Sequence, residues 1–372
     1  MVNKTTTVTI IASCAILAGA AAMYVLDSDL TTKMPDDAEY LTYAEASVRP
    51  IYSQLDMKEK AVYSSLLRGI EQEQETIALP IDVKGEEYAK VYRILEKQEG
   101  GFFYLDSVYY VGKRVRDAKI AYREKGDNSL KRKQLEEVVQ DVVDGARELR
   151  GDYYLVSYIS NYIINNCKYT DDIGEAYSST AYGCLVEGKA NCEGYAKAFN
   201  LLASQIGLRS VLITGTTDTD ENHAWNQVCI GVDWYNIDVT WSDTDIYGEV
   251  RREYFLRPDS DFLDSHNPDN ELFEPYICIK DDWNYYKRNG LYAATVAEAE
   301  SIVKRELGAG RNTIEIKFTS YDIYDKFRTI MSDEKRVLSI IESSGSSLSG
   351  SVSVSFKENH DEKRLTLTFS GS

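Results

Sequence analysis

Histidine is scarce in this chain, with three among 372 residues, and no two of the six cysteines are spaced as Cys-x-x-Cys. Zinc sites are built mainly from clustered cysteine and histidine ligands. We therefore expect neither a metal nor another cofactor. The acidic loop DTDE at 218–221 could bind Ca²⁺, but its spacing is not that of a known calcium loop, so a solvated loop is the better interpretation.

The chain also lacks an excess of positive charge. It carries 42 lysines and arginines against 60 aspartates and glutamates, which gives a formal net charge of −18. A protein that binds nucleic acid needs a basic surface to displace counterions from phosphates. We therefore expect no nucleic-acid partner.

Charge is absent from residues 5–26, between Lys4 and Asp27. This apolar run is just long enough to cross a bilayer, which takes about 20 residues. Because Lys4 precedes it and acidic residues follow it, the positive-inside rule places the body of the protein outside the membrane. Residues 1–26 are then either a cleaved signal peptide, with residues 20–22 (AAA) as the cleavage signature, or an uncleaved membrane anchor.

A third alternative for the N-terminus is a lipoprotein acylation signal at residues 11–14, IASC. The apolar run continues past this cysteine, which is the wrong order for such a signal. All three alternatives predict an extracytoplasmic protein, either secreted or anchored by its N-terminal segment.

Five cysteines lie beyond the segment that contains Cys14. Because five is an odd number, at least one thiol is free or linked to another molecule. Two alternatives stay open for four of them: up to two disulfides in an oxidising compartment, or four reduced and buried thiols. These four are Cys167, Cys184, Cys229 and Cys278.

The pattern along the chain predicts several regions. A polar linker at 27–37 leads to a mainly helical region at 38–150, which extended aromatic segments interrupt at 78–83 and 99–112. Residues 151–290 form the core region, where an amphipathic helix at 154–170 precedes a second helix and several strands. Residues 291–372 read as a small α/β unit with a helix, a strand, one long helix at 320–344 and two alternating strands.

The helix predicted at 192–206 begins with Cys192. Asn191 is a good N-cap, and Gly207 supplies the C-terminal stop. Most positions are apolar or small, so the helix is mostly buried, with one narrow polar ridge. The ridge consists of Glu193, Lys197, Asn200 and Ser204, and its first two members are spaced for an i,i+4 ion pair.

Cys192 has two interpretations. A free cysteine is among the most buried residue types and often acts as a small hydrophobe. A helix N-terminus, however, also lowers the pKa of a thiol, because unpaired N–H groups and the helix dipole favour the thiolate. The position therefore suits a nucleophile, which needs a base nearby.

A hairpin supplies the base. The strand HAWNQVCI begins at His223, and DWYNIDVT is the return strand. Gly231 at the first turn position suits a two-residue type II′ turn, which would place Trp225 opposite Asp238. His223 shares a face with Trp225 and is then a diagonal neighbour of Asp238, a geometry in which a carboxylate orients an imidazole.

Each residue of this trio also has a structural interpretation. His223 could end a loop, and Asp238 could be a buried acid bonded to backbone. An aspartate within YNIDVTW is costly without a partner, and His223 is the nearest candidate. The other two histidines, His266 and His360, lie in no comparable motif.

The stretches AYGCLVEGKANCEGYAKAFNLLASQIGL, HAWNQV and WYNIDVTW resemble the transglutaminase-like superfamily of papain-fold cysteine enzymes. The resemblance covers about residues 153–258 and is nearest to the exported form of Gram-positive bacteria. It implies an α+β papain-like core in which Cys192 attacks a carboxamide to form an acyl-thioester, with His223 as the base and Asp238 as its orienter. Water or an amine would then release the acyl group.

The sequence departs from animal transglutaminases, which use a tryptophan upstream of the cysteine to stabilise the oxyanion. All four tryptophans here follow Cys192. We expect the backbone N–H of Cys192 to hold the oxyanion, with the Tyr182 hydroxyl as a second donor or else a packing aromatic. Three tryptophans could line a substrate groove or belong to the core: Trp225, Trp234 and Trp241.

The sequence thus predicts an exported cysteine acyltransferase or cysteine peptidase that acts on proteins or peptides, including those of the cell surface or wall. The alternative is a surface module that keeps this fold for adhesion or binding without turnover. The intact trio favours the enzyme, since a binding module has no need of a His–Asp pair beside a helix-start cysteine.

Overall fold

The computed structural model describes residues 34–371, apart from 110–111, 124–127, 173, 246–249, 349–351 and 361. The predicted N-terminal segment 1–26, and the linker as far as residue 33, lie outside this description. Within the described residues, no helix combines the length and the apolar character needed to cross a bilayer.

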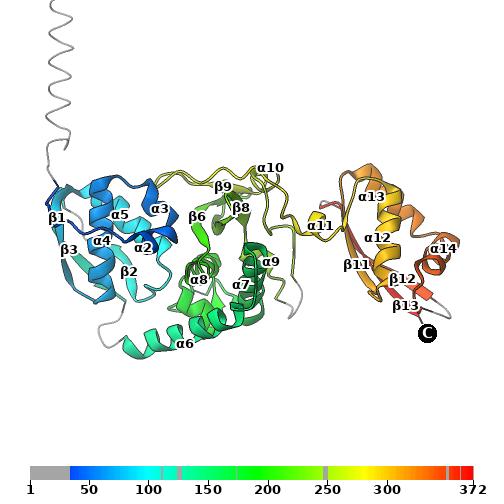
Figure 1. Cartoon of the computed structure of the whole chain (residues 1–372), viewed down its shortest axis with the longest axis horizontal. Coiled ribbons are helices and arrows are strands. Elements are labelled where there is room, and N and C mark those ends of the chain that lie inside the picture. The colour runs from blue at the N-terminus through cyan, green and yellow to red at the C-terminus, as the bar shows by residue number, and fades with distance from the viewer. Residues whose placement is uncertain are drawn as a thin grey trace, which may run out of the picture.

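The N-terminal region, at the left of Figure 1, combines helices with a three-stranded antiparallel sheet in the order β1-β3-β2. The two predicted extended segments fall in or beside strands β1 and β2. The prediction of helical structure is wrong for residues 114–122, which form strand β3. The elements are α2 (Tyr43–Ser47), α3 (Pro50–Gln54), α4 (Met57–Glu71), β1 (Thr76–Lys84), α5 (Gly85–Gln98), β2 (Leu105–Tyr109), β3 (Arg114–Tyr122) and α6 (Ser129–Ala146).

The core region is built on an antiparallel sheet in the order β8-β7-β6-β9, and α8 packs against β6 and β7. Helices α6 and α7 contact α8 in turn. The elements up to the hairpin are α7 (Asp152–Asn166), β4 (Lys168–Tyr169), η2 (Gly183–Glu187), β5 (Lys189–Ala190), α8 (Cys192–Gln205), β6 (Arg209–Thr217), β7 (Asn222–Ile230) and β8 (Asp233–Ile237). After it come α9 (Val239–Ser242), α10 (Asp259–Phe262), β9 (His266–Pro268) and α11 (Tyr285–Arg288).

The β7–β8 hairpin has the register that the sequence predicts. Ile230 pairs with Asp233, and the ladder runs to Asn226 and Ile237. Gly231 has φ of 64°, the left-handed value that a type II′ turn requires at its first position. Asp238 therefore follows directly after the last paired residue of β8.

The polar ridge of α8 faces the N-terminal region rather than solvent. Lys197 is 5% exposed, and its Nζ donates to Glu96 of α5 at 2.6 Å and to Glu193 at 2.8 Å. Asn200 donates to the backbone and side-chain oxygens of Gln98. In keeping with this contact, a single hydrophobic cluster runs through both regions.

The C-terminal unit stands apart in Figure 1 and has its own hydrophobic cluster. Its sheet has the order β10-β11-β13-β12. The predicted long helix at 320–344 is wrong in one respect: it is two helices, because the side chain of Asp333 caps a new start by accepting from the N–H groups of Lys335 and Arg336. The elements are β10 (Tyr292–Ala293), α12 (Val296–Gly308), β11 (Thr313–Phe318), α13 (Tyr321–Ile330), α14 (Glu334–Ser344), β12 (Val352–Asn359) and β13 (Arg364–Gly371).

Candidate active site

Cys192 is the first residue of α8, and its side chain is half-buried. Asn191 caps the helix by accepting a hydrogen bond from the Gly194 N–H at 3.2 Å. A side chain at position 194 would collide with the Ser178 carbonyl and with Ala190, so a glycine lets the first turn pack tightly on the preceding loop. The backbone N–H of Cys192 has no acceptor within its own helix, because the first N–H groups of any helix lack one.

A buried amide fixes α8 against the hairpin. Asn226 of β7 is 1% exposed, and its Nδ2 donates to the Ala196 carbonyl at 3.0 Å. Leaving this amide without a partner inside the protein would cost about 1–3 kcal/mol. The bond therefore holds the first turns of α8 in register with the strand that carries His223.

The imidazole of His223 lies between Asp238 and Cys192. Its Nε2 is 2.7 Å from Oδ2 of Asp238, and its ring also forms a hydrogen bond with the thiol of Cys192. Because Nε2 faces the carboxylate, Nδ1 is the ring nitrogen left for the thiol. His223 is 8% exposed and Asp238 has no exposed surface. The structure thus brings together the three residues that the sequence selects.

Asp238 serves two purposes at once. It is the N-cap of α9, and its Oδ1 accepts a hydrogen bond from the Trp241 N–H at 3.0 Å. Its own N–H donates to the Tyr254 carbonyl. The carboxylate is therefore fixed by backbone contacts, which leaves Oδ2 to face the imidazole.

A second histidine reaches the same carboxylate. His266 of β9 has its Nε2 3.1 Å from Oδ2 of Asp238, and no part of its side chain is exposed. Sequence reasoning passed over His266 because it lies 28 residues beyond Asp238 and in no motif of the resemblance. One signal could have drawn attention to it: the chain has only three histidines, so each of them is a candidate for a functional role.

Burial and hydrogen bonding act in opposite directions on these charges. Burial opposes a charge on His223, but the bonds to Asp238 and Cys192 outweigh it and raise the pKa of His223 to about 10. Burial also opposes the charge on Asp238, yet the bonds to His223 and His266 lower its pKa to about 2. At neutral pH a charged imidazolium therefore faces the thiol.

The tryptophans near the hairpin take different places. Trp241 is half-buried, and its ring centroid is 5.2 Å from that of His223, so it borders the candidate site. Trp225 is 1% exposed and packs edge-to-face on His266 at 5.0 Å, which makes it part of the core behind the site. Of these two, the structure favours only Trp241 as a residue that a substrate could meet.

Trp234 and Tyr182 lie in aromatic contacts of their own. Trp234 stacks on Tyr276 with ring centroids 3.8 Å apart, near the turn end of the hairpin. Tyr182 is 5% exposed, stacks on Phe103 at 4.7 Å and donates its hydroxyl proton to Gln134. This arrangement favours the packing alternative for Tyr182, and Cys192 N–H is left as the expected oxyanion donor.

Tyr169 is a further residue at the site that the sequence did not single out. It lies in β4 and pairs with Ala190, two residues before Cys192. Its side chain is 47% exposed. Burial, and after it Cys192, raise the pKa of Tyr169. An exposed aromatic residue therefore lies on the strand beside the start of α8.

Three side chains of this cluster are close enough together to hold a metal ion. One ligand atom from each of His223, Asp238 and His266 lies within 4.8 Å of the others. Their hydrogen bonds do not suit an ion. Both Nε2 atoms face a single carboxylate oxygen, where an N–H proton from each ring accounts for the short distances. We therefore treat the group as a hydrogen-bonded cluster rather than a metal site.

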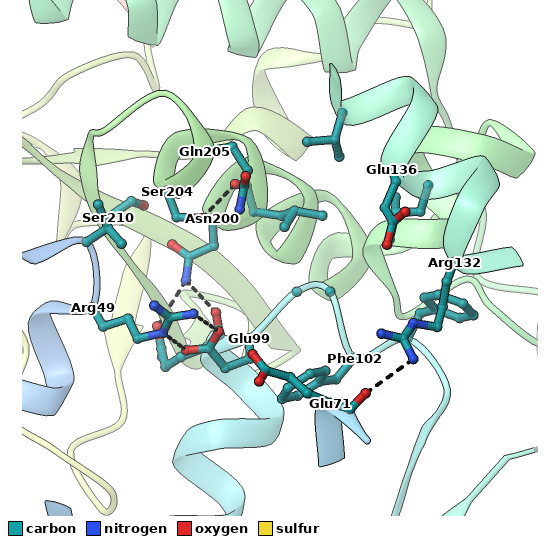
Figure 2. A pocket seen from close by; sticks show the side chains of 18 of the residues that line it. Arg49, Glu71, Glu99, Phe102, Arg132, Glu136, Asn200, Ser204, Gln205 and Ser210 are labelled. Carbon is teal, nitrogen blue, oxygen red and sulfur yellow. Dashed lines mark hydrogen bonds and ion pairs between the residues drawn. The ribbon is translucent and has the colours of Figure 1, made fainter. Parts of the chain in front are cut away.

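A cavity of about 580 Å³ opens at the opposite end of α8 (Figure 2). Asn200 and Ser204 line it, together with the loop after α5 and part of α6. Inside it, Nε of Arg49 is 2.7 Å from Oε1 of Glu99. Its walls include none of the three candidate catalytic residues.

The five cysteines of the described region are free thiols. Four are buried and Cys192 alone is half-buried: the buried ones are Cys167, Cys184, Cys229 and Cys278. This is the second of the two alternatives that the sequence leaves open.

Comparisons with known proteins agree with this core. Residues 137–239 match the model of the transglutaminase-like superfamily, a span that includes α8 and the hairpin as far as Asp238. The chain thus contains a transglutaminase-like domain, and the predicted α+β class with a papain-like transglutaminase core is confirmed.

The chain is similar to kyphoscoliosis peptidase of Mus musculus and of Homo sapiens, with 26% identity over 212 residues in each case. The similarity covers 49% of this chain and 31% of each relative, so the chain spans about a third of their length. Two solved structures are also similar. A TGase has 14% identity and a TM-score of 0.29, covering 37% of this chain and 43% of its own. A putative cysteine protease from Cytophaga hutchinsonii has 16% identity and a TM-score of 0.27, covering 40% and 56%.

Proposed function

We propose that this protein is a cysteine-dependent enzyme that transfers acyl groups from the carboxamides of proteins or peptides, with Cys192 as nucleophile, His223 as base and Asp238 as its orienter. One observation carries the proposal: the His223 ring bridges a buried carboxylate and a half-buried thiol at a helix N-terminus. A cysteine that served only for packing would not need a charged imidazole beside it.

In the first step the Cys192 thiolate attacks the carbonyl carbon of the carboxamide and forms a C–S bond. The backbone N–H of Cys192 is placed to donate to the oxyanion that develops. The C–N bond then breaks, and the His223 imidazolium gives its proton to the departing amine. The products are an acyl-thioester on Cys192, a free amine and a neutral imidazole.

In the second step the neutral His223 takes a proton from water or from an acceptor amine, which attacks the thioester. Water gives hydrolysis and an amine gives transfer or cross-linking, and both routes return Cys192 as thiolate and His223 as imidazolium. Asp238 stabilises the imidazolium through both steps and fixes the orientation of the ring. The half-buried ring of Trp241 borders the place where the acyl group would lie, and the exposed Tyr169 pairs with Ala190 just before Cys192.

The direct test is capture of the acyl-enzyme. The protein is incubated with peptides that carry glutamine or asparagine carboxamides, quenched in acid, digested and analysed by mass spectrometry. We expect an acyl group on the peptide that contains Cys192. Cys192→Ala should remove the adduct, whereas the matched variant Cys184→Ala, which loses a buried thiol, should retain it. A protein that binds peptides and never forms the adduct would favour a non-catalytic binding module.

We propose further that the enzyme works outside the cytoplasm, on proteins or peptides of the cell surface or wall. The support is the uncharged run at 5–26, with Lys4 before it and acidic residues after it. Fusion of residues 1–37 to a reporter that is active only after export should give activity. A reporter that stays inactive would contradict export.

A further inference from the structure

His266 is placed beside the candidate active site by contacts of its own. Its strand, β9, pairs with β6 so that Thr217 lies opposite His266. The pairing depends on Gly215, where a Cβ would collide with the Asn267 carbonyl. The lack of a side chain at Gly215 therefore lets β9 pair closely with β6, and this pairing brings His266 next to Asp238.

Three hydrogen-bond donors converge on the Asp238 carboxylate. Oδ1 accepts from the Trp241 N–H at 3.0 Å, while Oδ2 is 2.7 Å from Nε2 of His223 and 3.1 Å from Nε2 of His266. The two rings thus share a single oxygen. Each donor that binds a carboxylate stabilises its charge and reduces the charge that is left to attract the others.

Ser265 contacts the nitrogen of the His266 ring that does not face Asp238. Its Oγ is 2.9 Å from Nδ1 of His266 and 3.3 Å from the Phe262 carbonyl. The ring is thus held from both sides, since Nε2 faces Oδ2 of Asp238.

Aromatic rings enclose His266 completely. Phe262 stacks on it with centroids 3.9 Å apart, Trp241 lies at 4.5 Å, and Trp225 packs edge-to-face at 5.0 Å. The side chain has no exposed surface. A substrate cannot reach it, so any effect of His266 on a reaction passes through Asp238.

Few titratable groups meet this cluster. Asp238 comes from the β8–α9 junction, His223 from β7 and Cys192 from α8. Tyr254 contributes a ring centroid 6.0 Å from that of His266, and burial raises its pKa to about 12. The charge of this cluster is therefore shared among the carboxylate, the two imidazole rings and the thiol.

We propose that His266 is a positioning residue that shares the charge of Asp238 and so limits how tightly this carboxylate holds the proton of His223. Proton transfer is most efficient when the acid and base are matched to the working pH, and a carboxylate that served His223 alone would hold the imidazolium too firmly. The inference rests on the proposed function for its catalytic consequence, but the proton equilibrium of His223 can be measured without any substrate.

The first arm of the test is an NMR titration of the histidine ring nitrogens in the full-length protein. His266→Leu removes the donor and keeps an apolar side chain in the enclosure. We expect the midpoint for loss of the His223 proton to move upward by about half a pH unit or more. His266→Gln, whose amide can present an N–H to Oδ2, should restore the wild-type midpoint. Phe262→Leu, which loses the stacked ring but not the donor, should leave it in place.

The second arm is the rate of acyl-enzyme formation in the same variants. We expect about a tenfold loss in His266→Leu, of the size seen when an outer hydrogen-bond partner is removed from a site, and recovery in His266→Gln. Ser265→Ala frees Nδ1 and should shift the His223 titration partly in the same direction, which keeps a test available if the leucine variant does not fold.

The proposal is overturned if the leucine and glutamine variants titrate alike, or if His223 keeps its wild-type midpoint without the His266 donor. Absence of an acyl-enzyme in the wild-type protein together with the expected NMR shifts would instead reject the proposed function and leave the hydrogen-bonding role of His266 in place.

Discussion

The two ends of helix α8 use their polar residues in different ways. In its middle and C-terminal part, Lys197 is buried between Glu96 and Glu193, and Asn200 donates to Gln98. These groups are satisfied within the protein, and they join the N-terminal region to the core. Nothing in this part of the helix presents a reactive atom.

At the N-terminal end of α8, His223 and Asp238 lie beside the Cys192 thiol and leave it half-buried. Asp238 is held by donors on both oxygens, His223 is held by Asp238, and Cys192 is left half-buried at the end of the chain of contacts. A mostly buried helix can therefore use its polar side chains for contacts with another region and a single cysteine at its N-terminus for reactivity. This difference predicts that substitutions at the two ends will separate stability from activity.

Cys192→Ala should give the largest effect on activity and almost none on the fold. Because Cys192 is half-buried and alanine keeps its Cβ, we expect complete loss of acyl-enzyme with little change in melting temperature. The matched variant Cys184→Ala lies in the core, and it should lower stability by about 1–2 kcal/mol while acylation persists. Equal loss of acylation in both variants would break the comparison.

His223→Ala should lower the rate of acyl-enzyme formation by about 10³-fold or more, since both the imidazolium and the base are lost. The measurement is single-turnover acylation. Normal acylation in this variant would assign the base to another group.

Asp238→Asn should keep the fold and retain more activity than His223→Ala, because it removes the partner of the base rather than the base itself. Without the carboxylate, the pKa of His223 should fall from about 10 toward its ordinary value of 6.5. The His223 charge stabilises the wild-type fold fully below about pH 6.5, and this contribution is lost as the pH rises through about 10.

The Asp238 charge acts in the opposite direction. Its pKa is lowered from 3.8 to about 2, so its contribution is present above about pH 3.8 and is lost as the pH falls through about 2. Asp238→Asn should therefore flatten the dependence of the unfolding free energy on pH at both limits. Denaturant titrations from pH 2 to 10 measure this, and an unchanged profile would contradict the assignment of these charges. Asp238→Ala should also destabilise, because buried donors lose their acceptor.

Lys197→Met should give the smallest effect on activity and a clear effect on stability. It leaves the Glu96 and Glu193 carboxylates close together without their shared cation, which costs about 3 kcal/mol for a buried pair. Lys97 still contacts Glu193 at 2.8 Å and should soften the loss. Acylation per folded molecule should stay within about twofold. Loss of acylation without loss of stability would mean that the two ends are not separable.

Local rules predicted the parts of the site that depend on neighbouring residues. The N-cap at Asn191, the register of the β7–β8 hairpin and the position of Asp238 after it all follow from sequence spacing. His266 could not be predicted in the same way, because β9 reaches Asp238 only through its pairing with β6. A long-range contact of this kind leaves no periodic trace in the sequence.

Elsewhere the misses have similar causes. The ridge of α8 was visible as a stripe, but its partners Glu96 and Gln98 lie about a hundred residues earlier, and only the folded chain brings them together. The predicted long helix at 320–344 followed the apolar spacing and overlooked Asp333, whose side chain starts a new helix. The residues before and after Asp333 both have helical spacing, so the spacing alone did not indicate that one helix ends and another begins there.

The central claim is that the environment of Cys192 makes it the reactive thiol of this protein. It is tested most directly by competitive alkylation of the native protein with limiting iodoacetamide at pH 6, followed by peptide mapping. We predict that Cys192 reacts about tenfold or more faster than each buried thiol, because it is half-buried and lies beside the His223 imidazolium. The rate advantage should disappear in His223→Ala. Equal alkylation of Cys192 and the buried cysteines in the native wild-type protein would contradict the account.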